Sequence, residues 1–175
     1  AADGSFLVLP ELVLATSTGV HQYFTQATPG KFNVSGAIDV VGEAVVSHSR
    51  GFYDTPFDVT ITTPTEGAVI FYTLDGSTPL VTRGVQYTGP IHVDRTTCLR
   101  ALAIKPGWVS SSINTQTYVF PDQVIRQPGN PAGFPTSWQG TTADYQMDQR
   151  VVNDARYRGQ MRASLLSIPT MSVVT

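Results

Sequence analysis

The chain has 175 residues, of which only 14% are charged, and its formal net charge is −2. Globular domains carry about 25% charged residues, and a nucleic-acid-binding face needs clustered lysine and arginine, so nucleic acid is excluded as a partner. A membrane span within this sequence is also excluded, because no stretch approaches the ~20 apolar residues that one needs, and the abundant serine and threonine are typical of a secreted or cell-surface β protein.

Residues 1–35 contain short apolar runs that would bury too little surface for an independent core. They end in Thr28-Pro29-Gly30, followed shortly by Asn33. This ending resembles the last strand of a lamin-tail-like β domain. We therefore expect 1–35 to be the C-terminal remnant of such a domain and 36–50 to be a linker.

Alternating apolar and polar residues mark the next segment. Phe57, Val59 and Ile61 alternate with polar neighbours, and this period of two predicts a strand with one buried face. Short strands then recur every 8 to 12 residues, separated by glycine and proline, which predicts an antiparallel Greek-key β-sandwich of about seven strands over 51–121. Three residues of a later run are expected to face the same core: Leu99, Ala101 and Ala103.

A tight turn is predicted where the apolar run 68–73 meets an Asp-Gly pair. Aspartate and glycine tolerate positive φ, and the Asp75 carboxylate can accept from a backbone N–H two residues on. Pro79 cannot continue a central strand. We interpret Asp75, Gly76, Ser77 and Pro79 as a structural turn.

Several motifs of this segment resemble the immunoglobulin/fibronectin-III-like sandwich at the C-terminus of chitobiase and β-hexosaminidase-type enzymes. That family shows a Tyr-Thr-x-Asp-Gly-Ser-x-Pro turn, a Tyr-x-Gly-Pro-Ile segment and a Thr-Thr-x-Ile/Leu-Lys/Arg-Ala strand. The corresponding residues here are 72–79, 87–91 and 96–101, and 103–108 continue the likeness. The resemblance implies an accessory module that carries no catalytic residues of its own.

Prolines and glycines dominate 122–149, which predicts a linker without regular structure over most of its length. Beyond it, apolar residues recur at helical spacing, from Tyr157 to Ile168. One helix is therefore expected over 153–168, capped by Asn153 or Asp154 and ended by Pro169. The strand-like run 169–175 should pair with the sandwich, pair with a second copy, or fray.

The segments 133–138, 144–148 and 167–170 resemble the entry to a spore-coat-protein-H-type (CotH) kinase domain. The resemblance implies that 150–175 opens such a domain and that its nucleotide- and metal-binding residues lie beyond Thr175. None of them can be assigned within this sequence.

Catalytic and metal-ligating residue types are present but lack the spacing that a site needs. A glycosidase acid needs a second carboxylate about 5–10 Å away, and no motif pairs Asp75 with one. No hydrolase elbow or zinc-ligand spacing occurs. We therefore predict no catalytic residue, no metal and no cofactor. The candidates considered for catalysis or zinc binding were His21, His48, His92, Ser47 and Ser49. Asp144, Asp148 and Asp154 provide too few oxygen ligands for a calcium site, and Cys98 is interpreted as a small buried hydrophobic residue.

Three aromatic residues near turns, Trp108, Tyr87 and Tyr53, offer a glycan platform if their rings are exposed. Packing into the sandwich is the alternative role. The arginines Arg150, Arg156, Arg158 and Arg162 are interpreted as the solvated face of the helix or as docking contacts for a neighbouring domain.

These patterns favour a non-catalytic accessory or spacer module of a larger secreted or cell-surface protein. Its expected partners are the neighbouring domains of the same protein. One alternative is a carbohydrate-binding accessory, whose partner is a polysaccharide. The other is the N-terminal portion of a CotH-type kinase.

Overall fold

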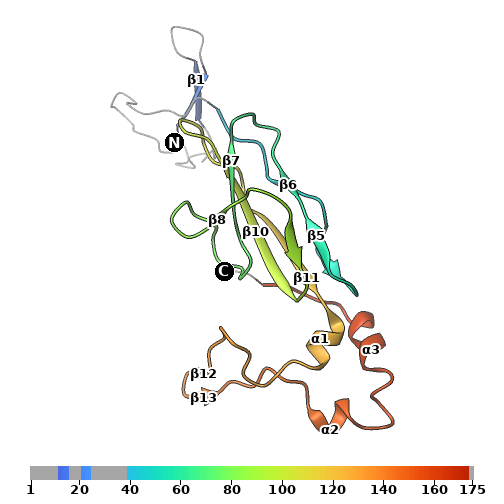
Figure 1. Cartoon of the computed structure of the whole chain (residues 1–175). Coiled ribbons are helices and arrows are strands. Elements are labelled where there is room, and N and C mark those ends of the chain that lie inside the picture. Colours follow the sequence, from blue (N-terminus) through green and yellow to red (C-terminus); the bar gives the residue numbers. More distant parts are fainter. Residues whose placement is uncertain (1–11, 16–20, 25–38, 174–175) are drawn as a thin grey trace, which may run out of the picture.

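The computed structural model describes residues 12–15, 21–24 and 39–173 (Figure 1). Residues 39–121 form a β-sandwich, and 122–173 form an extension of short helices and loops at its lower end in that view. The motif at 28–33 on which the lamin-tail resemblance depends lies outside the described residues. The described part before Asp39 is one antiparallel pair of strands, β1 (Leu12–Ala15) and β2 (His21–Phe24).

The larger layer of the sandwich is a five-stranded sheet with the order β4-β11-β10-β7-β8. Strand β10 is its centre and pairs antiparallel with β11 on one side and with β7 on the other. Leu99, Ala101 and Ala103 of β10 are fully buried, as the alternation predicted. The strands of this sheet are β4 (Gly51–Phe52), β7 (Val69–Thr73), β8 (Val85–Gln86), β10 (Thr97–Ile104) and β11 (Asn114–Val119).

The opposite layer is built from a run that changes partner halfway. Residues 57–62 form two strands on either side of Thr60, and each pairs with a different neighbour. Val59 and Ile61 are buried, whereas Phe57 is half-buried, so the predicted inward face is confirmed. The paired strands are β5 (Phe57–Val59) with β9 (Ile91–Val93), and β3 (Val45–Val46) with β6 (Ile61–Thr62).

The sandwich extends further toward the N-terminus than the sequence predicted. Val41 and Ala44 are core residues, and the Val41 backbone N–H donates to the Val109 carbonyl at 2.8 Å. Strand β3 supplies one edge of the second layer. The prediction of a linker is therefore wrong for 41–46. The few small apolar residues of 41–46 do not form an alternating pattern long enough to predict that they are buried.

An aromatic cluster fills the end of the core near β11. Tyr118 is fully buried, and the rings of Tyr53 and Phe57 meet it edge-on at 5.5 and 5.2 Å between centroids. The Tyr118 hydroxyl donates to the His48 carbonyl at 2.9 Å, which satisfies the buried phenol. Burial raises the pKa of Tyr118 far above its ordinary value, so this hydroxyl stays protonated.

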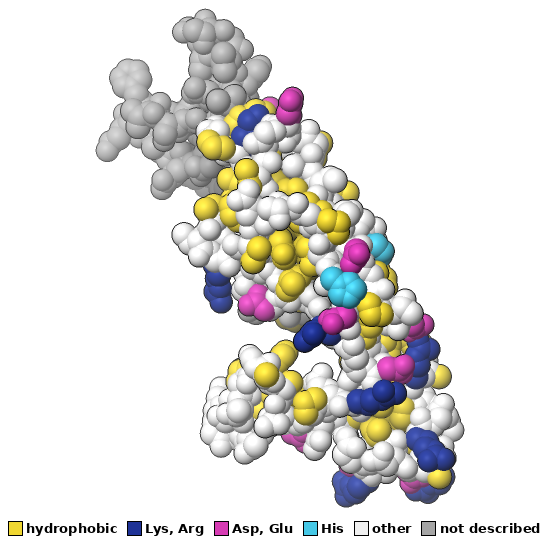
Figure 2. All heavy atoms as spheres, in the orientation of Figure 1, with side chains coloured by type: hydrophobic (Ala, Val, Ile, Leu, Met, Phe, Trp, Pro, Cys, Tyr) yellow, Lys and Arg dark blue, Asp and Glu magenta, His cyan; other side chains and the backbone are white. Residues whose placement is uncertain are grey.

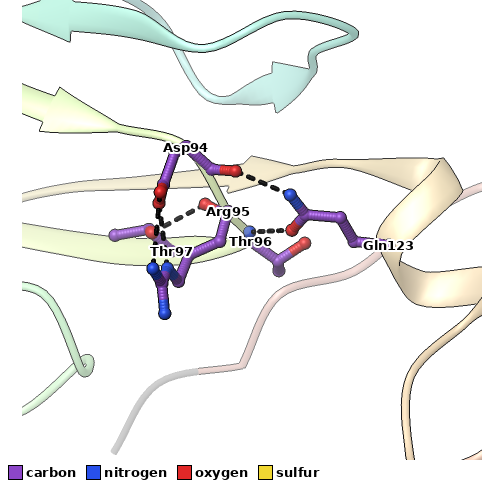
Figure 3. Close-up of polar contacts among 5 residues, drawn as sticks. All are labelled: Asp94, Arg95, Thr96, Thr97 and Gln123. Carbon is purple, nitrogen blue, oxygen red and sulfur yellow. Dashed lines mark hydrogen bonds and ion pairs between the residues drawn. The ribbon is translucent and has the colours of Figure 1, made fainter.

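Helix α1 (Pro121–Ile125) follows β11 directly and is fastened to the turn before β10. The Gln123 amide donates to the Asp94 carbonyl at 2.6 Å and accepts from the Thr96 backbone N–H at 3.2 Å (Figure 3). The Thr96 hydroxyl also accepts from the Phe120 backbone N–H at 3.0 Å. One glutamine thus joins the start of the extension to the sandwich.

The extension contains three short helices where the sequence predicted one. The predicted helix over 153–168 is wrong in its first half, because Asp154 accepts from the Arg156 backbone N–H and forms a turn there. Asn153 and Asp154 do not cap the helix that forms there, which begins after Gln160. The helix before it is capped by Asp148, which accepts from the Arg150 backbone N–H. The regular elements beyond α1 are the pair β12 (Ser137–Trp138) and β13 (Thr141–Thr142), and the helices α2 (Gln149–Val152) and α3 (Met161–Ser167).

Few contacts hold this extension to the sandwich. Within 122–173 no residue is buried, whereas the sandwich has a continuous core. Arg162 on α3 forms ion pairs with Asp54, after β4, and with Asp122 on α1. Figure 2 shows charged side chains gathered around the lower part of the molecule. Among the described residues, no helix has the length and apolar character that crossing a membrane requires.

Candidate functional site

The predicted turn is formed, and it is docked against the central strand. Asp75 Oδ1 accepts from both the backbone N–H and the hydroxyl of Ser77, at 2.9 and 2.5 Å. Gly76 has a φ of +77°. Its N–H donates to the Cys98 carbonyl at 3.0 Å, and its carbonyl accepts from Arg100 Nη1 at 3.0 Å. Pro79 is fully buried, so the whole loop is pinned to β10.

Gly76→Val is expected to lower the free energy of unfolding by about 1 kcal/mol or more, because a branched side chain disfavours positive φ. Gly89→Val is the matched control, since a Cβ at Gly89 meets nothing within 4 Å and its φ is not positive. Urea denaturation of both variants measures the difference. Equal midpoints for the two would contradict the role of Gly76.

The turn carboxylate also predicts a pH dependence. Hydrogen bonds from Ser77, the hydroxyl first and the backbone N–H second, lower the pKa of Asp75 below its ordinary value of 3.8. A group whose pKa is lower in the folded state stabilises the fold above its unfolded pKa of about 4, and this contribution is lost as the pH falls through the lowered value. The gap in thermal midpoint between wild type and Asp75→Asn should therefore be constant near neutral pH and shrink below about pH 4. A gap that stays constant to about pH 2 would contradict this.

The three candidate platform residues do not form one surface. Tyr53 belongs to the aromatic cluster near Tyr118, and its hydroxyl donates to the Ser49 carbonyl at 2.5 Å. Trp108 lies beyond the opposite end of β10, with the Lys105 ammonium 4.4 Å from its ring centroid. Tyr87 meets Tyr72 edge-on at 6.4 Å. All three rings are half-buried and pack against the sandwich core.

The histidines also lie apart. His48 contacts the Ser47 hydroxyl at 3.0 Å through Nδ1, but no described carboxylate accepts a hydrogen bond from that imidazole. His92 pairs with Asp58 at 2.8 Å across the exposed side of β5 and β9. His21 belongs to β2. Among the described residues no group of three or more metal-ligating side chains converges.

The aspartates considered as calcium ligands form ion pairs or hydrogen bonds with residues close to them in the sequence. Asp148 is paired with Arg150 and Asp154 with Arg156, each at 2.7 Å. These contacts lower the pKa of both carboxyls, chiefly through the arginine hydrogen bonds. Asp144 accepts from the Gln146 backbone N–H at 3.1 Å. Each aspartate therefore shapes its own turn.

A cleft on the outer face of the five-stranded sheet was not predicted from the sequence. Its volume is about 690 Å³, and it lies between β4, β10 and β11 on one side and residues 170–172 on the other. Alternation along β10 places Arg100 on the outer face, beside half-buried Cys98. That signal was readable, but no sequence pattern indicates that the C-terminal segment returns to cover this face.

The comparisons with known proteins agree with the sandwich. Residues 48–116 match the family model described as the chitobiase/beta-hexosaminidase C-terminal domain. The matched span begins between β3 and β4 and ends halfway along β11. No curated protein and no solved structure matches the chain. The match does not reach the segments that resemble a lamin-tail domain or a CotH-type kinase domain, and those two resemblances stay predictions. The chain thus carries, over 48–116, a sandwich similar to a glycoside-hydrolase-associated accessory domain.

Proposed function

We propose that the protein is a non-catalytic accessory module of a larger secreted protein, in which the sandwich supports and spaces neighbouring domains. The observation that carries the proposal is the family-model match over 48–116, the segment that contains most residues of the sandwich core. A module of this kind acts through its rigidity. The continuous core from Val41 to Phe120 supplies that rigidity.

The turn at 75–79, which contains the carboxylate considered as a general acid, supports the same proposal. The Asp75 carboxylate accepts hydrogen bonds from Ser77, and the N–H and carbonyl of Gly76 are hydrogen-bonded to residues of β10. A general acid needs a free carboxyl within reach of a substrate proton. These contacts make the turn a brace between two parts of the sheet.

The extension supports a role in joining domains. The segment 122–173 has no buried residue and therefore no hydrophobic core of its own, and several of its large apolar side chains are exposed. A surface of this kind favours packing against another protein domain. We therefore place the neighbouring domain of the same protein against 122–173. The large exposed side chains concerned are Phe134, Trp138, Tyr157 and Ile168.

Activity assays on the purified protein test the proposal. Chromogenic glycosides and ATP are offered to the folded 175-residue chain, with circular dichroism as the check on folding. We expect no turnover above that of a heat-unfolded sample. Turnover that a single substitution such as Asp75→Asn abolishes, without unfolding the protein, would overturn the proposal.

A further inference from the structure

The C-terminal segment completes a cleft against the outer face of the five-stranded sheet. After α3 the chain turns back toward the sandwich (Figure 1). The hydroxyls of Ser172 and Thr117 then lie 2.8 Å apart. Residues 170–172 and the strands β4, β10 and β11 enclose about 690 Å³. Binding sites for small ligands have volumes of about 300–1,000 Å³.

Two arginines stand on either side of a strip of hydroxyls in this cleft. Arg50 directly precedes β4 and Arg100 belongs to β10, and β11 lies between those strands. Strand β11 contributes Thr115, which faces Arg100 across the pair, and Thr117. Neighbouring strands are about 4.8 Å apart, so the two arginine backbones flank a strip about 10 Å wide. No aspartate or glutamate of the described residues lines the cleft.

Neither arginine is neutralised by the described part of the protein. No ion pair joins Arg50 or Arg100 to a described carboxylate. Arg100 donates from Nη1 to the Gly76 carbonyl, while its buried Nε–H has no hydrogen-bond partner. A buried donor without a partner is costly, because it has lost its hydrogen bonds to water. The rest of the Arg100 side chain lines the cleft.

We propose that this cleft binds a carboxylated glycan, with a uronic-acid carboxylate held by Arg50 and Arg100 and sugar hydroxyls held by Thr115 and Thr117. Guanidinium groups recognise carboxylates through paired, charge-assisted hydrogen bonds. Threonine hydroxyls both donate and accept, as sugar hydroxyls do. The proposal goes beyond the accessory role above and does not depend on it.

The position of the cleft favours a glycan over an acidic peptide. A peptide binds a sheet through main-chain hydrogen bonds along a free edge. This cleft lies on the face of the sheet, where the main-chain groups of β10 are engaged by β11 and β7. Over β10 the cleft therefore presents side chains and no free main-chain groups. Guanidinium and hydroxyl groups suit a ligand that carries one carboxylate and several hydroxyls on each unit.

Affinity electrophoresis and titration calorimetry of the full chain with polygalacturonate test this proposal. We expect binding that weakens with added salt, because the charges are partly exposed. Arg50→Gln and Arg100→Gln should each weaken binding by about tenfold or more, the factor that losing one charge-assisted hydrogen bond gives. Arg158→Gln removes the same charge from the exposed extension and should leave binding unchanged. Because Arg100 also braces Gly76, Arg50→Gln separates binding from folding.

Three further ligands distinguish binding of a carboxylated glycan from binding of an uncharged glycan, an acidic peptide or any polyanion. Fully methyl-esterified polygalacturonate keeps the sugar and removes the charge, and we expect it not to bind. Poly-glutamate at equal charge should bind at least tenfold more weakly, and equal or tighter binding would show an acidic-peptide site and overturn the glycan assignment. Equal binding of dextran sulfate, or unchanged affinity in both cleft variants, would show a non-specific polyanion effect and overturn it too. A failure here leaves the activity assays of the accessory role unaffected.

Discussion

Tyr118→Ala is expected to lower the free energy of unfolding by about 3–5 kcal/mol, the range for truncating a buried aromatic residue. The side chain is fully buried, and the rings of Tyr53 and Phe57 pack edge-on against it. Removing it opens a cavity between both layers at the end of β11. It also leaves the His48 carbonyl without the donor that now satisfies it. Guanidinium denaturation followed by tryptophan fluorescence measures the change.

Tyr118→Phe separates the ring from the hydroxyl. It removes only the hydrogen bond to His48 and should cost about 1 kcal/mol. A Tyr118→Ala variant as stable as Tyr118→Phe would contradict the cluster, because the ring would then contribute nothing to the core.

Leu99→Ala is expected to destabilise the sandwich by about 3 kcal/mol, within the range measured for buried leucines. Leu99 is fully buried on β10, the strand that pairs with both β7 and β11. Its neighbours on two strands of the sheet are held by backbone ladders and cannot collapse into the space. Thermal and denaturant midpoints should therefore both fall.

The matched control is Leu80→Ala, the same truncation at a residue that is 48% exposed in the loop before β8. Exposed substitutions of this kind usually change stability by less than about 0.5 kcal/mol. If both variants lose the same amount of stability, the core is misassigned and Leu99 does not lie at its centre.

Local sequence signals predicted the strands well because burial follows a period of two. Val59, Ile61 and Leu99 all face the core as predicted. The change of partner at Thr60 was not predicted, since alternation shows which face is buried but not which strand lies beside it. Strands β4 to β11 cover 51–121, one more than the expected seven or so.

The extension was predicted less well because its local signals compete. The apolar spacing from Tyr157 to Ile168 favours one helix, but Gly159 and the Asp154 turn interrupt it. Helix α3 begins only at Met161. Helices this short are marginal by themselves, so tertiary contacts such as the ion pair between Arg162 and Asp54 decide where they form.

The strand-like run 169–175 was expected to pair with the sandwich, to pair with a second copy or to fray, and its described residues 169–173 form no strand. The segment contacts the face of the sheet through Ser172 and Thr117 and does not pair with an edge. The cleft beneath it depends on this return of the chain. For that reason the alternation along β10 could place Arg100 on the outer face, but the cavity that it shares with Arg50 could not be predicted.

Native-state hydrogen exchange tests the central claim most directly, that 39–121 form one cooperative sandwich which carries the extension at its surface. The amides of Val41 and of β10 should exchange only through global unfolding, with the same free energy, because both are paired within the core layers. The amides of 137–167 should exchange through local opening, at least about a hundredfold faster. Rapid exchange at Val41, or protection of the α3 amides equal to that of β10, would contradict the account.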